Sequence, residues 1–155
     1  FILIDVNGIY KEESYFILQG EKIPKKAMKI HGITDEKCQQ EGVELEEALS
    51  ALDVAASKVD DIVGHNITFD YKVLHAYYLK EGVPFSLSKK NKIDTMRLTG
   101  KHLGHKPGFR ISLYNSAEKV LGNSTEWNEL KEKISMHSAD GDVFVTAILY
   151  HILKA

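Results

Sequence analysis

Blocks of apolar and polar positions along the chain predict an α/β fold. Residues 1–4 form an apolar run that ends at Asp5, and Asn7-Gly8 then favours a hairpin turn. Later apolar segments with a helical period are separated by glycine, proline and N-capping residues. Strands come first, and helices then alternate with short strands. This order is typical of an α/β domain with a mixed sheet flanked by helices.

The pattern predicts the following element boundaries. The expected strands cover residues 1–5, 9–19, 61–65 and 92–94. The expected helices cover a short piece opened by Pro24 and residues 35–40, 44–58, 68–81, 95–103, 113–121 and 143–153, whereas residues 126–135 fit either a loop or a helix. Thr34 and Ser112 are the expected N-caps of two of these helices.

The last expected helix carries an acid on its apolar side. A helical projection places Asp142 with the core-facing Leu149 and Leu153, whereas Asp140 points to the polar side. A carboxylate on a buried face is costly unless a cation or hydrogen-bond donors meet it. His137 lies just before the helix and can reach the same place. An acid that needs a cation, beside a base, suggests a metal-dependent hydrolase.

Composition narrows the class of protein. The chain has 155 residues, of which 43% are hydrophobic and 27% charged, which suits one globular domain over residues 1–155. The net charge of −2 argues against a broad basic surface for nucleic acid. Cys38 is the single cysteine, so a disulfide framework is excluded and a reducing cytoplasm is the expected compartment. No apolar run reaches the length of a membrane span. Because the chain begins at Phe1 inside an apolar run, we expect residues to precede it.

Three acids follow or begin apolar elements that are far apart in the sequence. Asp5 ends the first strand, Asp70 lies in the first turn of the helix after His65-Asn66, and Asp142 lies on the last helix. Acids in such positions could converge on a divalent ion. Their hard oxygen ligands suit Mg²⁺ or Mn²⁺.

Four motifs in order resemble the DEDD superfamily of 3′–5′ exonucleases. They are Ile4-Asp5, then Gly64-His65-Asn66-Ile67-Thr68-Phe69-Asp70, then Ile93-Asp94-Thr95, and finally His137 with Asp142 five positions later. This last spacing is similar to the His-type branch, DEDDh, which includes the epsilon proofreading subunits of bacterial DNA polymerase III. The segments His31-Gly32-Ile33-Thr34 and Ser112-Leu113 also resemble proofreading exonucleases. The resemblance covers nearly the whole chain.

The resemblance implies an RNase H-like fold and a set of site residues. It implies Asp5, Asp70 and Asp142 as ligands of two divalent cations, Mg²⁺ or Mn²⁺, and His137 as the general base that deprotonates the attacking water. The implied reaction releases nucleoside monophosphates from a single-stranded 3′ end, with DNA favoured over RNA. A polymerase subunit is the implied protein partner.

Several neighbouring residues have two interpretations each. His65 and Asn66 order the loop before Asp70 or contact the substrate, and Phe69 packs in the core or stacks on a base. A basic cluster is either a solvated face or a contact with phosphates; it consists of Lys101, His102, His105, Lys106 and Arg110. Asp94 is expected to cap the next helix.

The first motif departs from the family pattern of Asp-x-Glu. Asp5-Val6-Asn7 has an amide where the second carboxylate is expected, and an amide is neutral and a weaker ligand. Either the substitution is real and cripples the enzyme, or residues are missing between Asp5 and Val6, which we favour because few positions separate Asp5 from His31. A similar gap is expected near Gly104.

Three functions follow from these motifs. The favoured one is a metal-dependent exonuclease acting on single-stranded ends. The second is an RNA-trimming exonuclease, which shares the chemistry. The third is a non-catalytic module that binds nucleic acid or a polymerase, which is expected if Asn7 occupies the position of the family glutamate. The sequence contains neither a Gly-x-Ser-x-Gly elbow nor a phosphate-binding P-loop, which argues against other hydrolase classes.

Overall fold

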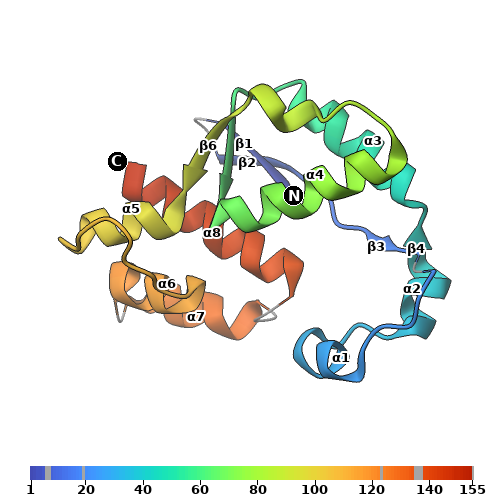
Figure 1. Cartoon of the computed structure of the whole chain (residues 1–155). Coiled ribbons are helices and arrows are strands. Elements are labelled where there is room, and N and C mark those ends of the chain that lie inside the picture. Colours follow the sequence, from blue (N-terminus) through green and yellow to red (C-terminus); the bar gives the residue numbers. More distant parts are fainter. Residues whose placement is uncertain (6–7, 19, 123, 135–137, 155) are drawn as a thin grey trace.

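The computed structural model describes residues 1–5, 8–18, 20–122, 124–134 and 138–154. Its order of elements is mixed α/β, as the sequence predicts (Figure 1). The strands are β1 (Ile2–Asp5), β2 (Gly8–Glu12), β3 (Phe16–Ile17), β4 (Gly42–Val43), β5 (Asp61–Gly64) and β6 (Asn91–Asp94). The α-helices are α1 (Lys25–His31), α2 (Asp35–Glu41), α3 (Leu45–Ala56), α4 (Ile67–Glu81), α5 (Thr95–His102), α6 (Leu113–Leu121), α7 (Thr125–Lys133) and α8 (Ala139–Lys154), and a 3₁₀ helix covers Ser86–Lys89.

In the described part of the chain the strands form three separate pairs. Strands β1 and β2 form the expected antiparallel hairpin, while β3–β4 and β5–β6 are parallel. The expected strand over residues 9–19 is wrong as a single element. Strand β2 ends at Glu12, and β3 leaves the hairpin to pair with β4 through Phe16 and Ile17. The alternation of side chains cannot reveal that break, because β3 exists only through a partner 26 residues away.

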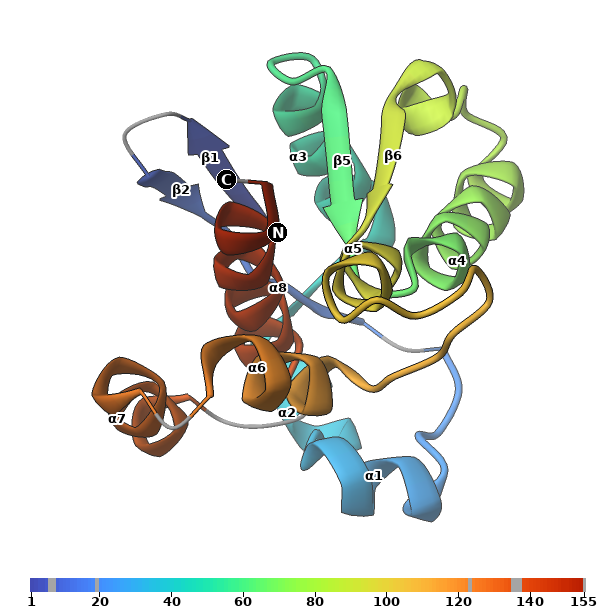
Figure 2. The same ribbon diagram turned by 90° about the vertical axis from the view of Figure 1, so that its left-hand side faces the viewer.

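Helix α8 connects the hairpin to the β5–β6 pair. It packs against both β1 and β5, and also against α5 and α6. Figure 2 shows β1 pointing towards the end of α8 where the chain terminates, whereas β5 and β6 point the opposite way, towards α5. The carboxyl end of β1, at Asp5, and that of β5, at Gly64, therefore point in opposite directions.

A small core fixes the position of α8. Trp127 of α7, Ala117 of α6, and Val145 and Leu149 of α8 are almost completely buried against one another. Residues 126–135, which the sequence left as loop or helix, are helical up to Lys133, and Ser124 Oγ accepts a hydrogen bond from Trp127 N at 3.2 Å. This cap begins the helix that delivers the largest side chain of the core.

Capping side chains set three other helix starts as the sequence predicts. Thr34, Asp94 and Ser112 each accept a backbone N–H at the start of α2, α5 and α6. Helix α8 starts earlier than expected, at Ala139, and the Ser138 hydroxyl accepts from Gly141 N at 3.1 Å. Both Asp140 and Asp142 consequently lie in its first turn.

Among the described residues, no helix has the length and apolarity needed to cross a bilayer.

A buried tyrosine links α4 to the elements that cover it. Tyr78 of α4 is fully buried, and its hydroxyl contacts the Asp53 carboxylate of α3 and the Ser86 hydroxyl. Burial, followed by the hydrogen bond to Asp53, raises the pKa of Tyr78 from 10.0 to about 12. This contact holds α4 in place behind the β5–β6 pair.

We expect Tyr78→Phe to lower the free energy of unfolding by about 1–2 kcal/mol, because Asp53 loses its buried donor. The raised pKa means that the tyrosine contribution is complete below pH 10 and is lost as the pH rises through about 12. The difference between the two proteins in urea unfolding should therefore shrink over that range. Tyr77→Phe is the matched control, because Tyr77 is 40% exposed. Equal effects of the two substitutions would contradict this account.

Candidate active site

The carboxyl ends of β5 and β6 are joined by the side chain of Asp94. Asp94 Oδ1 accepts hydrogen bonds from Asn66 N at 2.9 Å and Met96 N at 3.0 Å. The side chain is only 9% exposed, and Arg97 Nε lies 3.9 Å from Oδ2. Asp94 thus caps α5, as predicted, and also holds the turn that begins α4. Asn66 adopts a left-handed conformation with φ of 62°, which asparagine tolerates better than most residues.

His65 anchors the same junction through both ring nitrogens. Nε2 lies 2.9 Å from Ile111 O, and Nδ1 lies 3.0 Å from Thr95 Oγ1. Because a carbonyl oxygen only accepts, His65 Nε2 donates its proton to Ile111 O. Of the two interpretations of His65, these contacts support the ordering of the loop, since both nitrogens are already engaged.

Asp70 lies one turn into α4 and is exposed. Partial desolvation raises the pKa of its carboxyl group, the repulsion by Asp94 adds to the rise, and the backbone N–H of Asp70 opposes it. The two carboxylates are therefore close enough to interact. A cation at Asp70 would relieve both unfavourable effects, which makes this acid a suitable ligand.

Asp142 is held by a tyrosine that the sequence did not single out. Tyr114 of α6 donates its hydroxyl hydrogen to Asp142 Oδ1 at 2.8 Å. The partly buried position expected for Asp142 is confirmed, whereas Asp140 is exposed. The tyrosine offsets part of the desolvation cost, and a carboxylate has further lone pairs for a second partner. No local pattern signals this contact, because the two residues are 28 positions apart.

Asp5 lies away from the other two candidate ligands. It is exposed and pairs with Gly8 at the turn end of the β1–β2 hairpin. Burial chiefly lowers the pKa of the Phe1 amino group, and the nearby Asp140 carboxylate opposes this, so β1 begins beside the start of α8. Asp5 follows Phe1 by four residues of extended chain, which places it about 13 Å from Phe1 and hence away from the start of α8.

The family resemblance implies divalent ions, and the described residues fit such ions in part. They contain no group of three or more His, Cys, Asp or Glu side chains placed to hold a metal ion. Asp70 and Asp142 nevertheless present the hard oxygens that Mg²⁺ prefers, and Mg²⁺ often uses one or two carboxylates completed by water and substrate phosphate. His137 and Asn7 lie outside the described residues, as does the proposed gap after Asp5.

Phe69 is 64% exposed beside Asp70, so its interpretation as a core residue is wrong. Its face remains open to stacking on a planar group.

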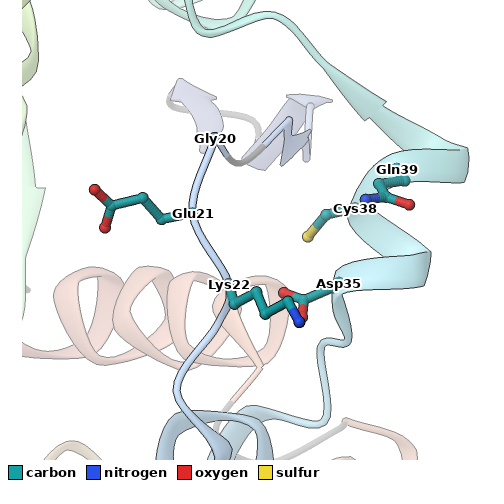
Figure 3. A pocket seen from close by; sticks show the side chains of 6 residues that line it. All are labelled: Gly20, Glu21, Lys22, Asp35, Cys38 and Gln39. Carbon is teal, nitrogen blue, oxygen red and sulfur yellow. The ribbon is translucent and has the colours of Figure 1, made fainter.

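A separate hollow lies between residues 20–22 and α2, lined by Gly20, Glu21, Lys22, Asp35, Cys38 and Gln39 (Figure 3). None of the candidate acids lines this hollow. Within it, Asp35 is already engaged, because its Oδ1 accepts from Ile23 N at 2.8 Å.

Comparison with known protein families places this chain in one family. A family model described as Exonuclease matches residues 4–150, which is nearly the whole chain. The match includes Asp5, Asp70, His137 and Asp142. A comparison with curated proteins gave no significant match.

We expect Asp70→Asn to raise the thermal midpoint at pH 7 by on the order of 1 °C, after screening by solvent. The raised pKa of Asp70 means that its stabilising contribution is complete below the ordinary value of 3.8 and is lost as the pH rises through the folded-state value. The gain should therefore vanish near pH 3. Asp60→Asn, at an exposed acid, is the control. A lower midpoint for Asp70→Asn at pH 7 would show that Asp70 stabilises the fold.

Proposed function

Because the chain belongs to the exonuclease family, in which the fold is RNase H-like, we propose that it is a metal-dependent 3′–5′ exonuclease acting on single-stranded nucleic acid, with DNA as the favoured substrate. The observation that carries the proposal is the match over residues 4–150, which includes the ends of β5 and β6 and the start of α8. The family supports a nuclease function; the direction, the sugar and the residue roles are the proposal.

In this proposal Asp70 and Asp142 are carboxylate ligands of divalent cations, two in number, as the family resemblance implies. When bound, Mg²⁺ or Mn²⁺ supplies positive charge that polarises the phosphoryl oxygens and lowers the pKa of a bound water. The protein contributes orientation: Tyr114 fixes one oxygen of Asp142, and the Asp94 contacts fix the turn before Asp70. Such outer contacts commonly tune ligand geometry and metal affinity.

His137 is the proposed general base. Its imidazole takes a proton from water, because a histidine pKa lies close to neutrality. The water oxygen then forms a bond to the terminal phosphorus while the bond to the 3′-oxygen of the preceding nucleotide breaks. A nucleoside 5′-monophosphate leaves, and the shortened strand retains its 3′-hydroxyl group after that oxygen is protonated.

Phe69 is the proposed stacking platform for a base near the 3′ end. Its ring is largely exposed and precedes Asp70 directly on α4. Stacking on an aromatic side chain is worth about 1–3 kcal/mol per base and is tolerant of sequence. His65 and Asn66 order the turn before Phe69 and Asp70, because their hydrogen bonds are made to other residues of the protein.

The test is degradation of a 5′-labelled single-stranded oligonucleotide with Mn²⁺ and, separately, with a chelator. We expect a ladder that shortens from the 3′ end and disappears with chelator. His137→Ala should slow it by about 10²- to 10⁴-fold, whereas His151→Ala, at an exposed histidine on α8, should not. Absence of cleavage by the wild type, with binding retained, would favour the non-catalytic module that Asn7 suggests. A ladder seen with RNA alone would favour the RNA-trimming enzyme.

Asp142→Asn and Asp140→Asn separate the proposed ligand from its neighbour in the same helical turn. We expect Asp142→Asn to weaken Mn²⁺ binding on the order of tenfold or more and to stop turnover, since it removes a charged ligand. Asp140→Asn should change either quantity by less than about twofold, because its carboxylate is exposed. A calorimetric Mn²⁺ titration that is unchanged in Asp142→Asn would remove Asp142 as a ligand.

A further inference from the structure

The positive charge of this chain is unevenly distributed. Residues 95–117 contain four Arg or Lys residues and no Asp or Glu, although the whole chain has a net charge of −2. The remainder is therefore acidic overall. Three of the four cations lie within residues 101–110, together with His102 and His105. This segment consists of the end of α5 and the loop that follows it, and is called the basic loop below. A local concentration of one sign creates a field that a net charge conceals.

The three cations of the basic loop face solvent. Lys101, Lys106 and Arg110 are all exposed, and none forms an ion pair with another residue of the described chain. Arg97, the fourth cation of the segment, differs because it lies 3.9 Å from Asp94. The positive charges of the basic loop are thus not neutralised by the protein and remain available to an anionic partner.

The basic loop has a defined backbone. The rings of His105 and Phe109 stack with centroids 3.8 Å apart, and His105 N donates to Gly100 O at 2.8 Å. Phe109 packs over buried Gly100, where an added Cβ would lie 3.4 Å from its ring. Gly108 has a φ of 93°, which side chains rarely adopt. These contacts reduce the ordering cost that a flexible loop pays on binding.

Both ends of the proposed site border this loop. Ile111, next to Arg110, accepts the hydrogen bond from His65, which precedes the helix of Asp70. Three residues later, Tyr114 holds Asp142. The segment directly after the loop is thus hydrogen-bonded to both parts of the proposed site.

We infer that the basic loop binds the phosphate backbone of the nucleic-acid strand behind its 3′ end. The inference rests on the proposed function for its direction along the strand. Exposed Lys and Arg side chains on a fixed backbone fit a polyanion with regularly spaced charges, because phosphate contacts position a strand without reading its sequence. The loop supplies affinity and register, while the acids remain the place of reaction.

The experiment compares two triple variants with the same change in charge. Lys101→Gln/Lys106→Gln/Arg110→Gln alters the loop, and Lys25→Gln/Lys26→Gln/Lys29→Gln alters three exposed lysines of α1. The probe is a fluorescein-labelled single-stranded oligothymidylate of about 20 nucleotides, followed by anisotropy in excess chelator at about 50 to 200 mM salt. The dependence of binding on salt reports the number of phosphates neutralised.

We expect the loop variant to bind roughly tenfold more weakly at low salt, and the slope of log K against log salt to fall by about 2, at ~0.7 per phosphate contact. The α1 variant should keep the wild-type slope. An unchanged slope in the loop variant, equal losses in both variants, or no binding by the wild type would each overturn the inference. Circular dichroism checks folding, and the single variants Lys106→Gln and Arg110→Gln replace the triple variant if it does not fold.

Binding in chelator separates this inference from the proposed function, because it requires no turnover. Hydrolysis of the p-nitrophenyl ester of thymidine 5′-monophosphate, a substrate too short to reach the loop, tests the chemistry alone. If the wild type hydrolyses neither this ester nor oligonucleotides, the exonuclease proposal fails while the binding comparison still decides the inference. If it hydrolyses both, the loop variant should lose at least about tenfold more activity on the oligonucleotide than on the ester.

Discussion

The carboxylate of Asp94 receives the backbone N–H groups of Asn66 and Met96, and the arrangement of the site depends on this contact. Hydrogen bonds to an ionised acceptor are stronger than those between neutral groups. One nearly buried charge therefore fixes the start of two helices, α4 and α5, at the ends of adjacent parallel strands. Asp70 and Phe69 take their positions from the first of these helices, and the basic loop follows the second.

The fixed carboxylate of Asp94 makes the ionisation of a neighbouring carboxyl group less favourable. Asp70 lies within the influence of Asp94, and desolvation and this repulsion together raise its pKa. A group that weakens the fold when ionised is the expected cost of a site built for a cation. Asp142 is treated differently, since Tyr114 supplies a donor from α6 before any ion is present. The fold thus supplies Asp142 with a side-chain hydrogen-bond donor, whereas desolvation and Asp94 disfavour the ionised form of Asp70.

Strand direction explains why Asp5 lies away from these acids. The β1–β2 hairpin and the β5–β6 pair both pack on α8, but β1 runs towards the end of α8 while β5 runs towards α5 (Figure 2). Asp5, at the end of β1, is therefore carried away from Asp94 at the end of β6 and from Asp70 in the helix that follows β5. Asp5, Asp70 and Asp142 have similar local sequence patterns, because each lies at the end or the beginning of an apolar element. The direction of the element nevertheless separates Asp5 from the other two.

The sequence by itself determined the features that depend on neighbouring residues. Thr34, Asp94 and Ser112 cap the helices that they precede, glycines end several helices, and the spacing from Asp142 to Leu149 places both on one side of α8. The order of the motifs was also enough to indicate the family, because it needs no coordinates. Tertiary structure alone decided the pairing of β3 with β4, the Tyr114–Asp142 contact, the engagement of both His65 nitrogens and the separation of Asp5. Each of these joins or parts residues distant in sequence, and such contacts depend on how whole elements pack rather than on the propensities of the residues in them.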